Sequence, residues 1–431
     1  MPPVAVPRAI QIPRLLKALA ALGWESTVVH SDIPLLSRYV PQDQTLVTVS
    51  QDSCQMVLAS PPLLMGPLRS RFGCRLLERL GWLEPLWRRA AAEVAERLLS
   101  WSRFDALVTF AQPWVDHLVG LDLCRKTGIP WVAHFSDPWI DSPYLDRTDP
   151  RISTWKAQEQ AVVREASAVV FVTAQTAERV MEKYPPAWRS KAHVVPHGFD
   201  SSLLDLLKEP ARTARLRILH TGSLYGIRTP RPFLQALADI NATRPLAAEL
   251  DVLFVGRTDQ AYDRMSAEFG LEQVVRFHPH APYLETLQLA ASADILLAID
   301  APTEANSMFL PSKLVDYLMF RKPILGLTPP RGASANLLLG ADCPVVPPDD
   351  VPMIQNAVSA LLERWKSKKL GVTHQFERTC ESHDINLVAQ SFEMALDSAI
   401  MSGRESAEPS VIRSPGMSPT TVAGSPGKRQ E

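Results

Sequence analysis

The residues best suited to chemistry lie in one short segment, Leu310 to Leu318, with the sequence LPSKLVDYL. Pro311 ends a loop and Ser312 can cap a helix, which would place unpaired backbone N–H groups beside the ammonium group of Lys313. Lys313 and Asp316 are three residues apart and share a helix face, so one could meet a diphosphate while the other meets hydroxyl groups. This pattern suits a nucleotide sugar, although an ordinary capped helix has the same appearance.

Two segments upstream add glycines and basic residues. The apolar run that begins at Leu216 is followed by Gly222, Gly226 and Arg228. A second apolar run ends in Gly256 and Arg257. Glycine lets a backbone approach a ligand closely, and a guanidinium group offers a phosphate two parallel donors. We therefore expect Gly222, Gly226, Arg228 and Arg257 to bind phosphate groups together with Lys313, although each arginine could also be a surface ion-pair partner.

The order of these segments, with those at 283–287 and 293–300, resembles the C-terminal half of the retaining glycosyltransferases of family 4. The likeness is to the bacterial branch that builds exopolysaccharides and lipid-linked glycans. Segments 22–29, 128–139 and 195–200 resemble landmarks of its N-terminal half, so the likeness covers roughly residues 2 to 400. It implies an α/β protein of the GT-B fold, in which two doubly wound Rossmann-like domains face a central cleft.

The resemblance also implies roles for individual residues. Donor phosphates would be held by the glycine loop, Arg228 and Lys313, and Asp316 would accept the ribose hydroxyls. The family has paired glutamates separated by seven residues, but here Met308 stands at the first position, with Glu304 and Asn306 in the same loop as candidate substitutes.

On the acceptor side, the candidate residues are Asp137 and His117. Asp137 follows an expected strand, at the edge where open α/β sheets bind ligands, although it could simply cap a loop ahead of Pro138. His117 could orient a hydroxyl group, or it could be structural. The neighbouring His134 and Ser136 depart from the Asp and Arg that are usual in the family.

The amino-acid composition argues against some classes of protein. The 431 residues are 46% hydrophobic and 21% charged, with a net charge of −1, so bulk nucleic-acid binding is not expected. Five cysteines without metal-ligand spacing suggest a reducing cytosol. The sequence has no apolar run of about 18 residues. We therefore expect a cytoplasmic protein whose membrane association, if any, is peripheral on the inner face.

One segment, 63–103, combines arginines with bulky apolar residues. Between Arg69 and Arg103 the chain has eight arginines and four glutamates, a local excess of four positive charges. This pattern predicts a surface for anionic lipid or a lipid-diphosphate acceptor. A solvated helix packed on the domain core would have the same composition.

Alternating strand and helix patterns predict two parallel sheets covered by helices. The expected divisions are an N-terminal domain (1–199), a linker (200–215), a C-terminal nucleotide-sugar domain (216–383), a helix returning to the first domain (384–401) and a disordered tail (402–431). In the N-terminal domain we expect strands at 27–30 and 45–49 and one helix over 76–100. The domain's usual first strand is missing from the sequence, which indicates either a start codon assigned too far downstream, which we favour, or real loss of the strand.

The sequence thus predicts a metal-independent retaining glycosyltransferase that needs no cofactor beyond its nucleoside-diphosphate sugar donor. The acceptor would be a glycan or a lipid-linked glycan. Two alternatives stay open. A nucleotide-sugar epimerase-like enzyme uses the same architecture, and a GT-B scaffold that has lost catalysis could act as a binding protein.

Overall fold

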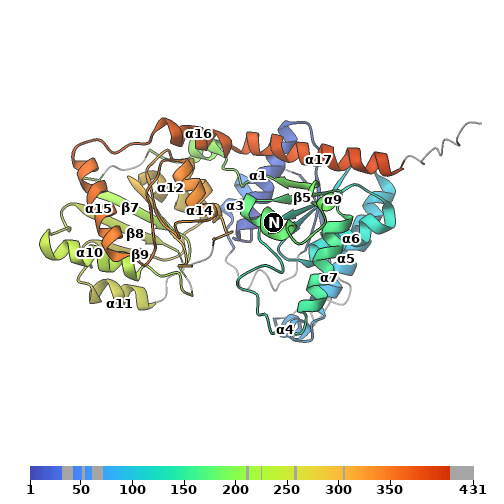
Figure 1. Ribbon diagram of the computed structural model, residues 1–431, viewed down its shortest axis with the longest axis horizontal. Coiled ribbons are helices and arrows are strands. Elements are labelled where there is room, and N and C mark those ends of the chain that lie inside the picture. Colours follow the sequence, from blue (N-terminus) through green and yellow to red (C-terminus); the bar gives the residue numbers. More distant parts are fainter. Residues whose placement is uncertain are drawn as a thin grey trace, which may run out of the picture.

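The computed structural model describes residues 1–31, 42–50, 54–60, 71–209, 213–224, 226–256, 260–303 and 306–407. The chain forms two α/β halves that lie side by side, each built around parallel strands (Figure 1). The expected α/β architecture with parallel sheets is confirmed.

The N-terminal half is centred on a four-stranded parallel sheet in the order β3-β4-β5-β6. Its strands are β3 (Leu107–Ala111), β4 (Trp131–Phe135), β5 (Ala168–Phe171) and β6 (Ala192–Val194). The described helices of this half are α1 (Pro7–Ala21), α3 (Thr45–Val49), α4 (Arg71–Arg79), α5 (Leu83–Trp101), α6 (Val115–Thr127), α7 (Ile152–Glu165), α8 (Ala174–Met181) and α9 (Pro186–Arg189). α1 packs on one face of the sheet, and α6 and α7 pack on the other.

Two further strands of this half stand apart from that sheet. β1 (Thr27–Ser31) and β2 (Gln55–Ala59) pair in parallel with each other and with no other described strand. Val28 and Val108 nevertheless join one apolar cluster, and Val29 and Leu107 join another. β1 and β3 therefore share apolar clusters without pairing.

Two local predictions for this half are wrong. Residues 45–49 form the short helix α3, because the Asp43 carboxylate accepts hydrogen bonds from both the N–H and the hydroxyl group of Thr45 and so starts a helical turn. The single helix expected over 76–100 is two helices, α4 and α5, which are separated at Gly81 by a backbone φ of +70°. A positive φ favours glycine and ends a helix.

The C-terminal half has a six-stranded parallel sheet in the order β12-β11-β10-β7-β8-β9. The strands are β7 (Leu216–Thr221), β8 (Leu250–Val255), β9 (Val275–His278), β10 (Ile295–Ile299), β11 (Ile324–Leu327) and β12 (Val345–Val346). Helices α10 (Arg231–Thr243), α11 (Gln260–Glu268) and α15 (Val351–Lys366) pack on one face. Helices α12 (Tyr283–Ser292), α13 (Ser312–Leu318), α14 (Ala333–Gly340) and α16 (His374–Ser382) pack on the other.

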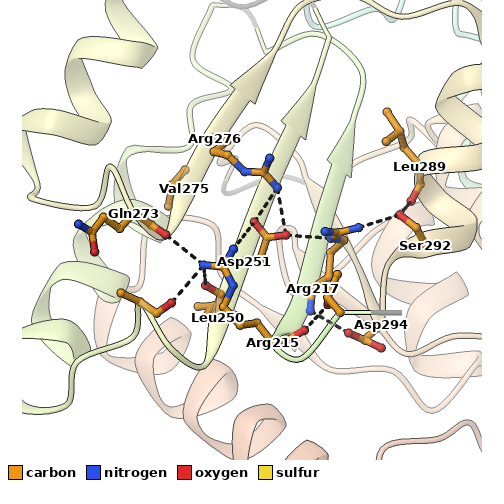
Figure 2. Close-up of polar contacts among 12 residues, drawn as sticks. Arg215, Arg217, Leu250, Asp251, Gln273, Val275, Arg276, Leu289, Ser292 and Asp294 are labelled. Atoms are coloured by element: carbon orange, nitrogen blue, oxygen red, sulfur yellow. Dashed lines mark hydrogen bonds and ion pairs between the residues drawn. The ribbon is translucent and has the colours of Figure 1, made fainter. Parts of the chain in front are cut away.

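A cluster of ionic groups holds the N-terminal ends of these strands together. The buried carboxylate of Asp251 lies 2.9 Å from Nε of Arg217 and 2.8 Å from an Nη atom of Arg276, and Arg215 lies 3.8 Å away (Figure 2). Asp294 accepts a hydrogen bond from the backbone N–H of Arg217. The cluster lies at the N-terminal edge of the sheet, whereas Gly222 lies at the opposite, carboxyl edge.

The chain crosses between the halves twice. Residues 201–206 form the 3-10 helix η3 (Ser201–Leu206) inside the stretch expected to be a linker. At the C-terminal end, α17 (Ile385–Ala407) packs against α1, β4 and β5 and runs along the N-terminal half (Figure 1). This helix continues to residue 407, so the tail predicted from 402 starts too early. Residues 408–431 of that tail lie outside the described residues.

Candidate functional site

Lys313 lies against the glycine loop that follows β7. A Cβ atom built on Gly222 would be 3.6 Å from Nζ of Lys313, and Gly222 has a φ of +97°. The loop and the lysine are 91 residues apart in the chain, yet the carboxyl end of β7 and the start of α13 bring them together. The structure thus unites two segments that the sequence assigned to one phosphate site.

His220 and Tyr317 fix the position of Lys313. Nδ1 of His220 lies 2.9 Å from the carbonyl oxygen of Leu297, so this nitrogen carries the proton and Nε2 is free to accept from Nζ of Lys313 at 3.1 Å. The hydroxyl group of Tyr317 accepts a hydrogen bond of 2.8 Å from the N–H of Thr221, which ties α13 to the end of β7. His220 and Tyr317 are fully buried, so they position the lysine rather than contact a ligand.

The charge on Lys313 is sensitive to its surroundings. Burial and the nearby guanidinium group of Arg228 lower the pKa of Lys313 to about 7, while the Asp300 carboxylate acts in the opposite direction. An Nη atom of Arg228 lies 3.6 Å from Oδ1 of Asp300, which also accepts, through Oδ2, a hydrogen bond from Thr328. Two cationic side chains therefore lie beside one carboxylate at the carboxyl edge of the sheet. A diphosphate placed there would favour the charged form of the lysine.

Gly256 shapes the same edge from the neighbouring strand. A Cβ atom at this position would be 2.5 Å from the carbonyl oxygen of Gly222, and its φ is +156°. Only glycine lets the loops after β7 and β8 approach this closely. Gly226 is exposed in open space with a φ of +61°. Arg257, the remaining phosphate candidate, lies outside the described residues.

Ser312 does not have the predicted role of helix cap. It is the first residue of α13, Pro311 occupies the N-cap position, and no side chain caps the helix. Because α13 spans only seven residues, the argument for a phosphate site rests on Lys313 and the glycine loop rather than on the helix terminus.

Asp316 meets the N-terminal half instead of open solvent. Its Oδ1 atom accepts a hydrogen bond of 2.8 Å from Arg14 of α1, and Arg14 also donates to the hydroxyl group of Tyr283 and to the carbonyl oxygen of Gly198. The Arg14 side chain is 6% exposed. Oδ2 of Asp316 lies 3.4 Å from the Tyr283 hydroxyl oxygen. The predicted ribose-binding carboxylate is thus already one member of a buried bridge between the two halves.

The loop that carries Met308 also contacts the N-terminal half. The carbonyl oxygen of Met308 accepts from the hydroxyl groups of Thr173, at 3.2 Å, and Thr176, at 3.4 Å. Asn306 is exposed, and Glu304 lies outside the described residues. The backbone of Met308 therefore joins the two halves, and its side chain supplies no carboxylate for a sugar.

On the acceptor side, Asp137 follows β4 at the carboxyl edge of the N-terminal sheet. Burial raises the pKa of its carboxyl group, and the positive charge of Arg8 opposes that shift. Arg8 lies in the first turn of α1, with Nη1 3.4 Å from Nδ1 of His134. The sequence placed Asp137 correctly after a strand but gave no signal for Arg8, which reaches this edge from the other end of the domain.

His117 is enclosed in the N-terminal core. It is fully buried, its ring centroid is 4.6 Å from that of Phe135, and its Nδ1 atom is 2.7 Å from Oγ1 of Thr109. Burial and the charge of Arg8 lower the pKa of His117 to about 3, so the ring is neutral at physiological pH. This position favours the structural role over the orientation of a hydroxyl group on the surface.

The described part of the chain contains no group of three or more His, Cys, Asp and Glu side chains that could hold a metal ion. Within the same residues, no helix is both long enough and apolar enough to cross a membrane.

Comparison with known proteins identifies a domain and a fold. Residues 9–198 match the family model for a glycosyl transferase 4-like domain. No curated protein matches the chain. Among solved structures, sucrose-phosphate synthase from Thermosynechococcus elongatus is similar over 90% of this chain and 92% of its own, with a TM-score of 0.62 and 16% identity.

Two other solved structures share the architecture. A trehalose-6-phosphate phosphatase N-terminal domain from Candida albicans covers 90% of this chain and 94% of its own, with a TM-score of 0.61 and 11% identity. A protein assigned as a UDP-N-acetylglucosamine 2-epimerase from Listeria monocytogenes is similar over 91% of this chain and 93% of its own, with a TM-score of 0.54 and 11% identity. The chain therefore has the GT-B fold, and its residues 9–198 are similar to a glycosyl transferase 4-like domain.

Proposed function

We propose that the protein is a retaining glycosyltransferase that moves a sugar from a nucleoside-diphosphate donor to a glycan or lipid-linked acceptor. The observation that carries this proposal is the contact between Lys313 and the Gly222 loop, with Arg228 beside them, at the carboxyl edge of the C-terminal sheet. Cationic groups held in this way stabilise the charge that develops on a diphosphate leaving group. The match of residues 9–198 to a glycosyl transferase 4-like domain also supports a transferase.

A panel of nucleotides tests the donor site. UDP, GDP, ADP and their sugars are titrated into the full chain while its melting temperature is recorded. A ligand present at a hundred times its dissociation constant stabilises a protein by about 2.7 kcal/mol, which is easily measured. One nucleotide class should raise the melting temperature. The absence of any shift with all three classes would contradict the proposal and favour the scaffold that has lost catalysis.

A second assay, NMR of the donor sugar, separates transfer from epimerisation. An epimerase-like enzyme, whose architecture the Listeria structure shares, converts the donor sugar without an acceptor. We expect this protein to leave the sugar of its donor unchanged when no acceptor is present, as monitored by NMR of the anomeric protons. We also expect turnover to survive EDTA, because Lys313 and Arg228 can supply the positive charge for which other transferases use a metal.

We further propose that the protein binds anionic membranes through α4 and the turn that follows it. Phe72 is 79% exposed and Trp82 is 58% exposed, and Leu76 and Leu80 are exposed between them. The segment 71–79 has three arginines and one glutamate. Exposed bulky apolar residues next to an excess of positive charge favour shallow insertion into an anionic surface.

Within the predicted segment 63–103, α4 supports this proposal better than α5 does. Arg88 is paired with Asp122 and Arg89 with Glu93, so these two arginines of α5 already have acidic partners. Ala90 and Ala91 are buried against the domain. Residues 61–70 lie outside the described part of the chain. The contact with lipid would therefore be made by α4, at the lower edge of the N-terminal half in Figure 1.

Vesicle flotation tests the membrane proposal. The wild-type protein should float with anionic vesicles at low salt and less at high salt, since the Debye length shortens from about 10 Å at 0.1 M to about 3 Å at 1 M. The double variant Phe72→Ser, Trp82→Ser should lose this recovery. The matched control is Trp101→Ser, which removes an 80% exposed tryptophan outside α4. Equal recovery with neutral and anionic vesicles would contradict the proposal.

A further inference from the structure

Several buried polar groups around the carboxyl end of β4 lack a hydrogen-bond partner. Among the described residues these atoms are Nη2 of Arg8, Nε2 of His117 and Oγ of Ser136. Ser136 directly follows β4, the ring of His117 packs on Phe135, and Arg8 contacts His134. A buried donor without a partner costs about 1–3 kcal/mol, so the unpaired Nη2 atom of the Arg8 guanidinium group points to a ligand that supplies acceptor oxygens.

The hydrogen-bond pattern indicates that the unpaired ring nitrogen of His117 is a donor. Nε1 of Trp131 donates to Oγ1 of Thr109, and this hydroxyl group lies 2.7 Å from Nδ1 of His117. Among the described contacts, Nδ1 is the one acceptor within reach of the hydroxyl hydrogen. The proton of the neutral imidazole is therefore on Nε2. Nε2 of His117 is thus a buried N–H donor without an acceptor, as Nη2 of Arg8 is, but His117 does not line the cavity beside Arg8.

A small cavity lies beside Arg8, on the α1 and α17 face of the sheet. Its volume is about 30 Å³, and it is partly open. Arg8, Gln11, His134 and His197 line it with polar groups, and the rest of its wall is apolar, including Phe110 and Phe392. No carboxylate lines this cavity, although Asp116 and Asp137 lie close enough to influence Arg8 from outside it.

The charge of Arg8 acts on all the surrounding rings. Burial lowers the pKa of His117, of His134 and of His197, and the positive charge of Arg8 lowers each of them further, so all three rings are neutral. Among the described residues, Arg8 forms no salt bridge with Asp116 or Asp137. A cation in a largely apolar surrounding attracts an anion more strongly than one in water. Arg8 is therefore the centre of an anion site.

The size of the cavity selects the kind of anion. One water needs about 10–15 Å³ measured in this way, so 30 Å³ holds the two oxygens of a carboxylate but not a whole phosphate group. We infer that the N-terminal half binds a carboxylate of the acceptor through Arg8, with neutral imidazole and amide groups completing the site. This inference rests on the proposed transferase function and defines its acceptor as an acidic sugar or glycan.

Glucuronate and glucose are a matched pair of probes, because they differ only in the carboxylate. NMR titration of the full chain should give a lower dissociation constant for glucuronate than for glucose, by about 10- to 150-fold, the range expected for a charge-assisted hydrogen bond. Inorganic phosphate, titrated into Lys313→Ala so that the proposed donor site does not bind it, should bind more weakly than glucuronate does to the same variant. Equal dissociation constants for glucuronate and glucose, or tighter binding of phosphate, would overturn the inference.

Variants assign the effect to Arg8. Arg8→Gln should abolish the preference for glucuronate, and Arg8→Lys should keep part of it. The control Arg89→Gln removes an exposed arginine of the same half and should leave the preference unchanged. If Arg8→Gln does not fold, the dissociation constants of the wild type for glucuronate and glucose still test whether the protein has a carboxylate site. A folded Arg8→Gln that retains the full preference would contradict the assignment.

The donor site provides an independent readout. Arg8→Gln should bind the nucleotide found by the donor panel as tightly as the wild type does, whereas Lys313→Ala should bind it weakly but keep the preference for glucuronate. If the wild type binds no nucleotide but still prefers glucuronate, the proposed transferase function fails and the carboxylate site stands. If the wild type binds nucleotide but does not prefer glucuronate to glucose, the proposed carboxylate site is wrong and the proposed transferase function stands.

Discussion

At the scale of single residues, Lys313 and Arg228 should dominate donor affinity. Lys313→Ala or Arg228→Ala removes a charge-assisted contact with the diphosphate, which is worth about 1.5–3 kcal/mol, or about 10- to 150-fold in affinity. Calorimetry with the matching nucleoside diphosphate measures the change. Arg231→Ala, which removes an exposed cation three residues after Arg228, is the control and should have little effect. Unchanged affinity in both site variants would contradict the diphosphate assignment.

The lowered pKa of Lys313 predicts a pH dependence of donor binding. With a pKa of about 7 in the free protein, the lysine is charged below pH 7 and becomes neutral above it. A bound diphosphate raises this pKa, so binding above pH 7 requires the uptake of a proton. Affinity should be constant below pH 7 and fall by up to about tenfold per pH unit above it.

Calorimetry at pH 8 in two buffers with different ionisation enthalpies detects this proton directly. The observed binding enthalpy should differ between the buffers for the wild type and should agree between them for Lys313→Met. A wild-type affinity that stays flat from pH 7 to pH 9 would show that the lysine keeps its charge without the ligand.

The residues of the donor site were predictable only in part. The sequence assigned Gly222, Arg228 and Lys313 to one proposed site because each follows or lies near the end of an apolar run, and the structure brings these three residues close together. His220 and Tyr317 belong to the same segments, but their roles depend on contacts with Leu297 and Thr221 that only the folded sheet creates. Arg14 had no signal at all, because its partner Asp316 is 302 residues away.

At the scale of elements, the loops after β7 and β8 depend on Gly256. Gly256→Ala would place a methyl group 2.5 Å from the carbonyl oxygen of Gly222, so the phosphate loop must shift. We expect a lower melting temperature and a loss of nucleotide affinity. Gly270→Ala is the control, since Gly270 has a φ of +63° but nothing within 4 Å of its added Cβ, and should cost only about 1 kcal/mol.

Nucleotide affinity separates these two glycine variants more clearly than stability does. Gly270→Ala should bind as the wild type does, because the strain stays at a distant turn. If Gly256→Ala also retained full affinity, the close approach of the two loops would not matter for the ligand.

The parallel sheets covered by helices were predictable from the sequence, because continuous apolar runs mark buried parallel strands. The error at residues 45–49 has a local cause. Its apolar and β-branched residues are typical of a strand, but the turn that the Asp43 carboxylate forms with Thr45 outweighs that preference. A single contact of this kind can determine whether a short segment forms a helix or a strand. Such contacts cannot be predicted from the pattern of residue types alone.

At the scale of the whole molecule, the bridge from Arg14 to Asp316 and Tyr283 should hold the two halves together. Asp316→Ala leaves a buried guanidinium group without its carboxylate, and breaking a buried pair in this way costs about 3–5 kcal/mol. Urea unfolding should show this loss. Lys17→Ala breaks a pair with Asp200 in which the lysine side chain is 47% exposed, and should cost under about 1 kcal/mol.

A double variant shows whether the stability lost in Asp316→Ala comes from the unpaired charge of Arg14 or from the packing around it. Arg14→Met combined with Asp316→Leu removes both charges and should recover most of the stability lost in Asp316→Ala, because an apolar pair can replace a buried ion pair. If the double variant is less stable than the single one, packing around Arg14, rather than an unpaired charge, explains the loss.

The separation of β1 and β2 from the main N-terminal sheet has a consequence for the native-state fluctuations of the protein. A strand pair that shares no ladder hydrogen bonds with its neighbours can open without breaking the rest of the sheet, and such units have a local opening free energy below that of global unfolding. Hydrogen exchange should therefore be faster for the amides of β1 and β2 than for those of the fully buried β4 and β5. Equal protection in all four strands would mean that they unfold as one cooperative unit.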